Sequence, residues 1–169
     1  MNLGIGGHTR PREGKSNDWI TPAYIIEALG DFDLDPCACD PQPWPCALRS
    51  FTKEDDGLSR KWQGRVWCNP PYGKEAWPFL ERLAQHKNGT ALIFARTETE
   101  GFFEHVWSKA YSLLFLKKRI HFCYPDGTRA KTNSGGPSVL VAYDKNNSQK
   151  LRHSGLEGAH VRFWSGAGD

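Results

Sequence analysis

Residues 66–73 read Val66-Trp67-Cys68-Asn69-Pro70-Pro71-Tyr72-Gly73, an apolar triplet followed by a rigid polar corner. Consecutive apolar residues are typical of a strand that is covered on both faces. The two prolines fix two backbone dihedrals and remove two N–H donors, so the corner presents carbonyl acceptors. Apolar residues then recur with the period of an amphipathic helix at Ala76, Phe79, Leu80, Leu83 and Ala84. This order predicts a strand, a corner and a helix of an α/β fold.

Strands and helices alternate on both sides of this unit. We predict helices over residues 22–29 and 102–110, and strands over residues 31–35, 90–95, 111–116, 120–124 and 138–143. Thr21 is the expected N-cap of the first helix. Strands separated by helices favour a mostly parallel sheet, and the last two strands, with no helix between them, favour an antiparallel edge. Only about thirty residues separate the block at residues 35–39 from Asn69. This stretch is too short for two full strand–helix units, so we expect a trimmed sheet.

Composition divides the chain into three parts. We expect a flexible polar arm over residues 1–16, a folded domain over residues 17–143 and a polar tail over residues 144–169. The chain has 24% charged and 38% apolar residues, as an ordinary soluble protein does. It has no run of about 20 apolar residues for a membrane helix and no apolar signal core. We therefore expect a cytoplasmic protein without membrane contact.

The cysteines and tryptophans are expected to be structural. Cys37, Cys39 and Cys46 are close in sequence, but Cys68 and Cys123 stand alone, so the paired clusters of a zinc site are missing. We expect reduced thiols and no metal. Large aromatic side chains are usually buried, so we place four tryptophans in the core. These are Trp19, Trp62, Trp67 and Trp77.

The corner at residues 69–72 suits chemistry at a planar amine. Ligands of open parallel sheets collect at the carboxyl ends of strands, and the corner directly follows a strand. The Asn69 oxygen and a carbonyl oxygen can accept hydrogen bonds from the two N–H groups of a weakly nucleophilic amine and stabilise its developing positive charge. Tyr72 supplies a flat face on which an extrahelical base can stack. The pattern favours methylation of an amino group, and an ordinary turn is the alternative.

Four further blocks accompany the corner. They are Asp18-Trp19-Ile20-Thr21-Pro22, Phe32-x-Leu34-Asp35-Pro36-Cys37-Ala38, Asp55-Asp56-Gly57-Leu58 with Trp62, and Arg119-Ile120-x-Phe122. With these blocks in this order, residues 17–143 resemble the phage-type, Dam-like DNA adenine-N6 methyltransferases. The resemblance implies a Rossmann-like methyltransferase fold, S-adenosylmethionine as cofactor and DNA as partner.

The resemblance also implies roles for particular residues. Those implied to hold the target adenine are Asn69, Pro70, Pro71 and Tyr72. Those implied to contact the cofactor are Thr21, Pro22, Asp35, Pro36, Cys37, Asp56 and Asn69. The chain departs from many methyltransferases after its first strand, where residues 35–39 read Asp-Pro-Cys-Ala-Cys in place of a Phe-x-Gly-x-Gly loop. Asp56-Gly57 is also an ordinary turn pair, so the role of Asp56 stays open.

A basic segment lies late in the chain. Residues 109–131 hold six lysines and arginines against one aspartate, although the net charge of the whole chain is only +3. Such a segment is suited to DNA phosphates, and the alternatives are a solvated face or a disordered loop. The residues expected to contact DNA are Lys118, Arg119, Arg129 and Lys131.

Two other functions remain open at this stage. A glutamine side-chain amide is also a planar amine, so the same corner would suit methylation of a protein glutamine. A chain that retained DNA but not the cofactor would be a non-catalytic nucleic-acid-binding module.

Overall fold

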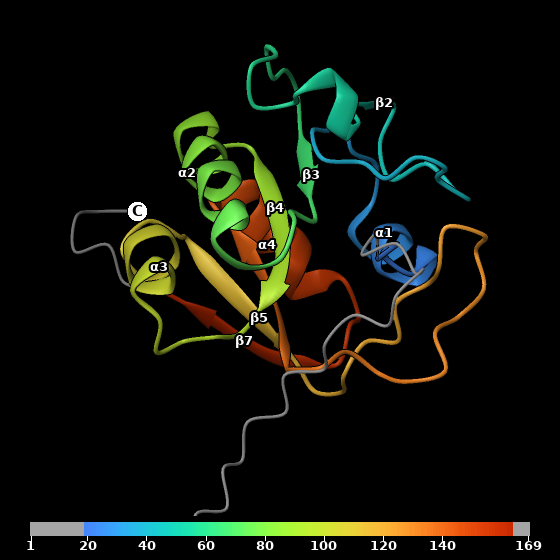
Figure 1. Ribbon diagram of the computed structural model, residues 1–169. Coiled ribbons are helices and arrows are strands. Elements are labelled where there is room, and N and C mark those ends of the chain that lie inside the picture. The colour runs from blue at the N-terminus through green and yellow to red at the C-terminus, as the bar shows by residue number, and fades with distance from the viewer. Residues whose placement is uncertain (1–18, 164–169) are drawn as a thin grey trace, which may run out of the picture.

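A mixed sheet forms the middle layer of the computed structural model, which describes residues 19–163 (Figure 1). Its strands are β1 (Leu34–Asp35), β2 (Arg49–Ser50), β3 (Val66–Cys68), β4 (Gly89–Phe94), β5 (Ser112–Leu116), β6 (Ser138–Ala142) and β7 (Gly158–Arg162). Their order across the sheet is β2-β1-β3-β4-β6-β5-β7. The pairs from β2 to β4 are parallel, whereas β6 is antiparallel to both β4 and β5, and β7 is antiparallel to β5.

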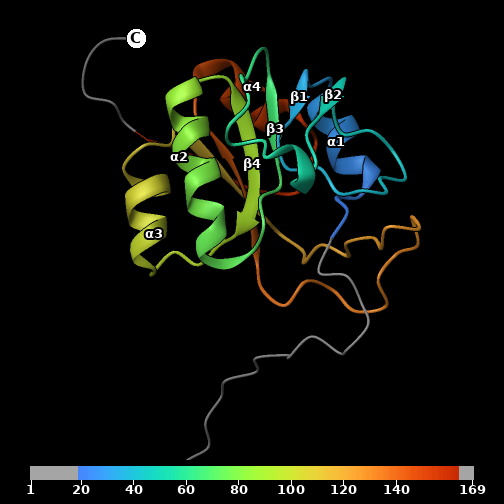
Figure 2. The ribbon, with the colours of Figure 1, turned by 45° about the horizontal axis from the view of Figure 1, so that its top comes forward.

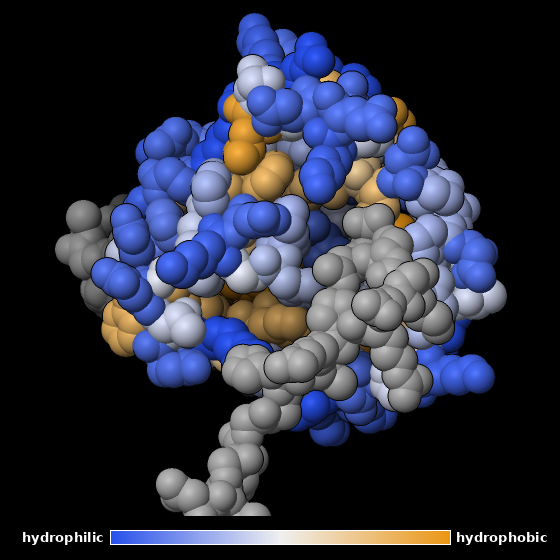
Figure 3. All heavy atoms as spheres, in the orientation of Figure 1, coloured by the Kyte–Doolittle hydropathy of each residue, from blue (hydrophilic) through white to orange (hydrophobic). Residues whose placement is uncertain are grey.

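Helices cover both faces of this sheet (Figure 2). The α-helices are α1 (Ala23–Leu29), α2 (Ala76–His86), α3 (Glu100–Phe102) and α4 (Lys145–His153); α3 continues into a π-helical turn, η3 (Phe103–Trp107). Short 3-10 helices are η1 (Lys53–Asp55) and η2 (Gly73–Glu75). Side chains of α2, α3 and η3 pack on one face of the sheet, and those of α1 and α4 pack on the other. On the face seen in Figure 3, hydrophilic side chains dominate the periphery and apolar ones gather nearer the middle.

The predicted antiparallel strand lies inside the sheet and not at its edge. All five residues of β6 are buried, since the strand is covered on both faces and lies between β4 and β5. The predicted strand over residues 120–124 is wrong, because only Cys123 forms isolated bridges, to Ile20 and to Arg129. Residues 122–130 instead turn back on themselves at Asp126-Gly127, and we call this segment the 122–130 hairpin.

The chain between β1 and β3 contains only the two-residue strand β2 and the 3-10 helix η1, whereas the sheet as a whole has seven strands within the described residues. In contrast, the expected polar tail is largely folded. Helix α4 buries Leu151, and β7 pairs along its length with β5. The sequence concealed β7 because most of its side chains are exposed, so the strand has no apolar alternation. The expected arm over residues 1–16 lies outside the described residues. No helix in the described part is both long and apolar enough to cross a membrane.

A buried arginine ties the amino-terminal side of the sheet together. Arg65 is only 7% exposed, and burial lowers its pKa to about 10. Its guanidinium donates to the carbonyl oxygens of Leu29 and Asp31 at 2.9 and 2.8 Å and to Asn147 Oδ1 at 2.7 Å. It also lies over the Phe32 ring, 3.9 Å from the centroid.

Replacing Arg65 with lysine is expected to lower the free energy of unfolding by about 2–4 kcal/mol. A lysine has no planar fork to reach three separate oxygens, so buried acceptors lose their donors. Urea unfolding followed by circular dichroism measures the change. The matched control is Arg49→Ala, an exposed arginine with one long hydrogen bond of 3.4 Å to the Gln63 carbonyl, for which we expect less than about 0.5 kcal/mol. Equal stability of Arg65→Lys and the parent would contradict the structural role of the fork.

Candidate active site

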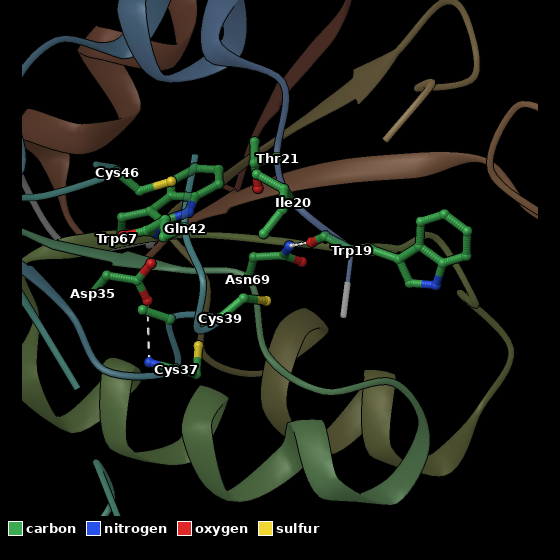
Figure 4. A pocket seen from close by; sticks show the side chains of 11 residues that line it. Trp19, Ile20, Thr21, Asp35, Cys37, Cys39, Gln42, Cys46, Trp67 and Asn69 are labelled. Atoms are coloured by element: carbon green, nitrogen blue, oxygen red, sulfur yellow. Dashed lines mark hydrogen bonds between the residues drawn. The ribbon is translucent and has the colours of Figure 1, made fainter. Parts of the chain in front are cut away.

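The parallel strands bring two predicted residues to one edge of the sheet. Asp35 is the last residue of β1, and Asn69 directly follows β3, its parallel neighbour. Figure 4 shows both side chains reaching into one hollow. The hollow has a free volume of about 20 Å³, little more than one water molecule occupies. Its lining consists of Trp19, Ile20, Thr21, Asp35, Cys37, Ala38, Cys39, Gln42, Cys46, Trp67 and Asn69.

Asp35 is a buried carboxyl group at the floor of this hollow. Its Oδ1 accepts a hydrogen bond of 3.1 Å from the Cys37 backbone N–H, and Gln42 also hydrogen-bonds to it. Burial raises the pKa of Asp35 to about 7, and these hydrogen bonds offset part of the rise. No lysine or arginine of the described chain forms an ion pair with it. A buried carboxyl group in this state is well suited to a positively charged ligand.

Two more polar groups of the hollow lack partners. The Thr21 hydroxyl and the Trp67 indole N–H are buried, and neither forms a hydrogen bond within the described chain. Thr21 is therefore not the helix cap predicted from the sequence, since Pro22 takes the N-cap position of α1. Buried polar groups normally find partners, and leaving one unpaired costs about 1–3 kcal/mol. Both groups belong to residues that line the same hollow as Asp35.

The side chain of Asn69 has a fixed orientation. Its Nδ2 donates a hydrogen bond of 3.0 Å to the backbone carbonyl of Trp19, as the dashed line in Figure 4 shows. Because the amide nitrogen is engaged there, the Oδ1 atom is left to accept from a ligand. An oriented acceptor of this kind requires no rearrangement when a substrate amine arrives.

The rest of the corner runs over the surface beside the hollow. Pro70 is buried and Pro71 is exposed, and neither lines the hollow. The Tyr72 ring is stacked on Phe94, the last residue of β4, with centroids 4.7 Å apart and planes within 10°. Tyr72 keeps 38% of its surface exposed. Gly73 then takes a φ of +81°, a conformation that favours glycine, and the chain enters η2 and α2.

Residues 19–21 connect the corner to two other loops. Ile20 and Cys123 exchange backbone hydrogen bonds of 3.0 and 2.9 Å, which join this segment to the 122–130 hairpin. The Trp44 indole N–H donates to the Thr21 carbonyl at 3.0 Å, which joins it to the loop after β1. Three loops that are distant in sequence are thereby fixed around the hollow.

The block around Asp56 supports the site from outside. Asp56 is exposed in a left-handed conformation and does not line the hollow. Its neighbour Gly57 lies so close to Pro36 that a Cβ would come within 1.9 Å of the Pro36 carbonyl oxygen. The Trp62 indole N–H donates to the Gly57 carbonyl at 2.8 Å. Gly57 therefore packs against the residue that follows β1, and Trp62 fixes Gly57 by a hydrogen bond. These contacts give both residues of the block a structural role at the end of β1.

The structure brings together only part of the predicted cofactor set. Thr21, Asp35, Cys37 and Asn69 line the hollow, whereas Pro22, Pro36 and Asp56 do not. Cys37 and Cys68 lie with their Sγ atoms 3.6 Å apart, and all five cysteines are free. No group of three or more His, Cys, Asp or Glu residues suited to a metal ion occurs within residues 19–163.

The predicted DNA-contacting residues lie on different segments. Arg129 pairs with Cys123 across the 122–130 hairpin, and Lys131 is exposed directly after it. The Arg119 guanidinium donates to the Ser134 carbonyl at 3.4 Å. Lys118 instead lies 3.9 Å from Glu157, just before β7. Within the basic segment, the 122–130 hairpin is thus the part that is hydrogen-bonded to Ile20, a residue that lines the hollow.

Comparison with known protein families identifies the family of this chain. A family model described as DNA N-6-adenine-methyltransferase (Dam) matches residues 8–155, most of the chain. The chain belongs to this Dam family. No curated protein and no solved structure matches it. The Dam family comprises DNA adenine methyltransferases, and the mixed α/β sheet is compatible with a methyltransferase fold.

Reasoning from the sequence missed several residues that line the hollow. Gln42, Cys46 and Trp67 line the hollow. Trp44 donates a hydrogen bond to the carbonyl oxygen of Thr21, another lining residue. Trp67 lies in β3, directly before the corner, and its apolar neighbours indicated only core packing. The matched range of the Dam family also includes all of α4, the helix assigned from sequence to a polar tail.

Proposed function

We propose that the chain transfers the methyl group of S-adenosylmethionine to the N6 amino group of adenine in DNA, on a Rossmann-like methyltransferase fold. The observation that carries the proposal is the oriented Asn69 amide beside a hollow that contains a buried carboxyl group without an ion-pair partner among the described residues. Membership of the Dam family supports DNA adenine as the acceptor.

The residues of the hollow fit S-adenosylmethionine. When bound, this cofactor supplies a methyl group activated by a positively charged sulfur. Asp35 would bind the cofactor's amino group, because a buried carboxylate without a cation gains most from an opposite charge. The Thr21 hydroxyl and the Trp67 indole N–H would form the hydrogen bonds that they lack within the protein. The free volume of the hollow, about 20 Å³, is far below that of a pocket that encloses such a ligand, so we assign its residues to contacts with only part of the cofactor.

The corner would hold the adenine. The Asn69 Oδ1 atom and the Pro70 carbonyl oxygen accept hydrogen bonds from the two N–H groups of the amine. These bonds pull the nitrogen toward tetrahedral geometry and stabilise the charge that it gains. Tyr72 stacks on the base and keeps it in line with the activated methyl group. No covalent enzyme intermediate is required.

Transfer of labelled methyl groups to unmethylated DNA, followed by mass analysis of the nucleosides, tests the proposal. We expect N6-methyladenine as the product. Label on cytosine, or on glutamine of an added protein extract, would overturn the acceptor. DNA binding without S-adenosylmethionine binding in isothermal titration would indicate the non-catalytic module instead.

Replacing Arg129 and Lys131 together with alanine is expected to weaken DNA binding about tenfold at moderate salt. It is also expected to reduce the slope of log affinity against log salt by about two, since each phosphate contact contributes about one. Fluorescence anisotropy at several salt concentrations measures both quantities.

The matched control for this pair is Lys145→Ala with Arg152→Ala. Both residues are exposed on α4, which starts where β4 begins, at the opposite end of the strands from Asn69. We expect the control to leave DNA affinity within about twofold of the parent. If both double variants weaken binding equally, the hairpin has no special role.

A further inference from the structure

Five aromatic rings form a continuous row from the corner to the 122–130 hairpin. Phe94 stacks on Tyr72 at 4.7 Å, and Tyr72 meets Phe122 edge to face at 6.5 Å. Phe122 lies 6.4 Å from Trp19, and Trp19 lies 5.7 Å from Tyr124. The rings of Tyr72 and Trp19 are therefore neighbours through one shared partner, the buried Phe122.

Two rings of the row, those of Tyr72 and Trp19, are partly exposed to solvent. Tyr72 is 38% exposed and Trp19 is half-buried, which differs from the core position expected for Trp19. In Figure 4 the Trp19 indole points away from the hollow that contains Asp35. Trp19 thus contributes its backbone carbonyl to Asn69 and leaves its ring outside the cofactor hollow.

Positive charge lies beside this end of the row. Tyr124 and Cys123 belong to the 122–130 hairpin, and Arg129 is paired with Cys123. Arg129 and the following Lys131 are both exposed. Aromatic plates beside basic side chains are the combination that binds unpaired nucleotides, with bases on the rings and phosphates on the cations.

We propose that this row binds single-stranded DNA, with the target adenine on Tyr72 and the adjoining unpaired base on Trp19. The assignment rests on the proposed function for its adenine. A single base that is flipped out of a duplex requires only one aromatic ring on which to stack. A second, partly exposed ring that neighbours the first through Phe122 is useful when the adjoining base is unstacked as well. A strand that is already unpaired occupies both rings without the cost of opening a duplex.

The test compares one adenine-containing DNA sequence as a single strand and as a perfect duplex, with an RNA strand of the same sequence as a third substrate. Fluorescence anisotropy measures binding, and labelled-methyl transfer measures kcat/KM. We expect kcat/KM for the single strand to exceed that for the duplex at least tenfold. Trp19→Leu is expected to weaken single-strand binding about tenfold, whereas Trp19→Phe retains most of it. Both variants keep the Trp19 carbonyl that orients Asn69.

Phe103→Leu is the matched control. Phe103 is an exposed aromatic residue on η3, on the other side of the molecule from α1 and the hairpin (Figure 1), and we expect no change in binding. Equal or better methylation of the duplex, or single-strand binding unaffected by Trp19→Leu, would overturn the inference and leave adenine methylation intact. Tighter binding of the RNA strand would overturn the assignment to DNA. Single-strand binding that requires Trp19, without any methyl transfer, would support the row and refute the proposed activity.

Discussion

Asn69→Ala is expected to lower the rate constant of methyl transfer about a thousandfold while DNA affinity stays within a few-fold of the parent. Removing one preorganised hydrogen-bonding group from a reacting centre typically costs a factor of 10²–10³. The loss here falls at the upper end, because the Oδ1 atom is already oriented by the bond from Nδ2 to the Trp19 carbonyl. Single-turnover transfer of labelled methyl groups at saturating cofactor gives the rate constant directly.

Asn69→Asp separates the acceptor role from a structural one. An aspartate keeps an acceptor oxygen but cannot donate to the Trp19 carbonyl, so it holds that oxygen less firmly. We expect its rate constant to lie between those of the parent and Asn69→Ala. If Asn69→Ala transfers methyl groups within tenfold of the parent rate, Asn69 does not activate the amine and the proposed mechanism fails.

Asp35→Asn is expected to weaken S-adenosylmethionine binding on the order of a hundredfold, because removing one partner of a buried ion pair costs several kcal/mol. Asparagine has nearly the same shape, so the change removes the charge and little of the packing. Isothermal titration at pH 8 measures the affinity. An unchanged affinity would show that Asp35 does not bind the cofactor's amino group.

The same substitution is expected to stabilise the protein without cofactor. The folded-state pKa of Asp35, about 7, lies above its ordinary value of 3.8. The contribution of Asp35 to stability is thus fully present below about pH 4 and is lost as the pH rises through about 7. At pH 8 the parent retains a buried charge that Asp35→Asn lacks, so the variant is expected to be more stable by a few kcal/mol. A residue with a purely structural role would show a loss of stability instead.

Cofactor affinity of the parent is expected to depend on pH for the same reason. S-adenosylmethionine would bind the ionised carboxylate, so affinity falls by up to tenfold for each pH unit below about 7. Affinity levels off above pH 7 and falls again once the cofactor's α-amino group, with an ordinary pKa of about 8, loses its proton. Titrations between pH 5.5 and 8.5 measure the profile. In Asp35→Asn this dependence is expected to disappear, and a profile shared by both proteins would assign it to another group.

Much of the site could be predicted from the sequence because its signals are local. The apolar triplet of β3, the two prolines after it and the helical period of α2 each lie within a few residues of one another. The resemblance implied that both Asp35 and Asn69 contact the cofactor, and the structure places them at the same edge because they lie at the carboxyl ends of neighbouring parallel strands. The resemblance in five blocks gave the family, which the match over residues 8–155 confirms.

The parts that could not be predicted depend on contacts between distant residues. Nothing in the apolar run of β6 shows that it enters the sheet between β4 and β5, and nothing in the exposed side chains of β7 marks it as a strand. The predicted strand over residues 120–124 failed because its residues pair with the segment at residue 20 and with their own hairpin.

The sequence by itself determined a buried strand that ends in a rigid Asn-Pro-Pro-Tyr corner, since dihedral restrictions and apolar periodicity act within a few residues. Only the tertiary structure decided how that corner is oriented. Asn69 and the Trp19 carbonyl are 50 residues apart, and their hydrogen bond forms because the sheet edge and the hairpin hold both segments at the same hollow. No local pattern encodes such a contact, because it depends on where the folded chain places its loops.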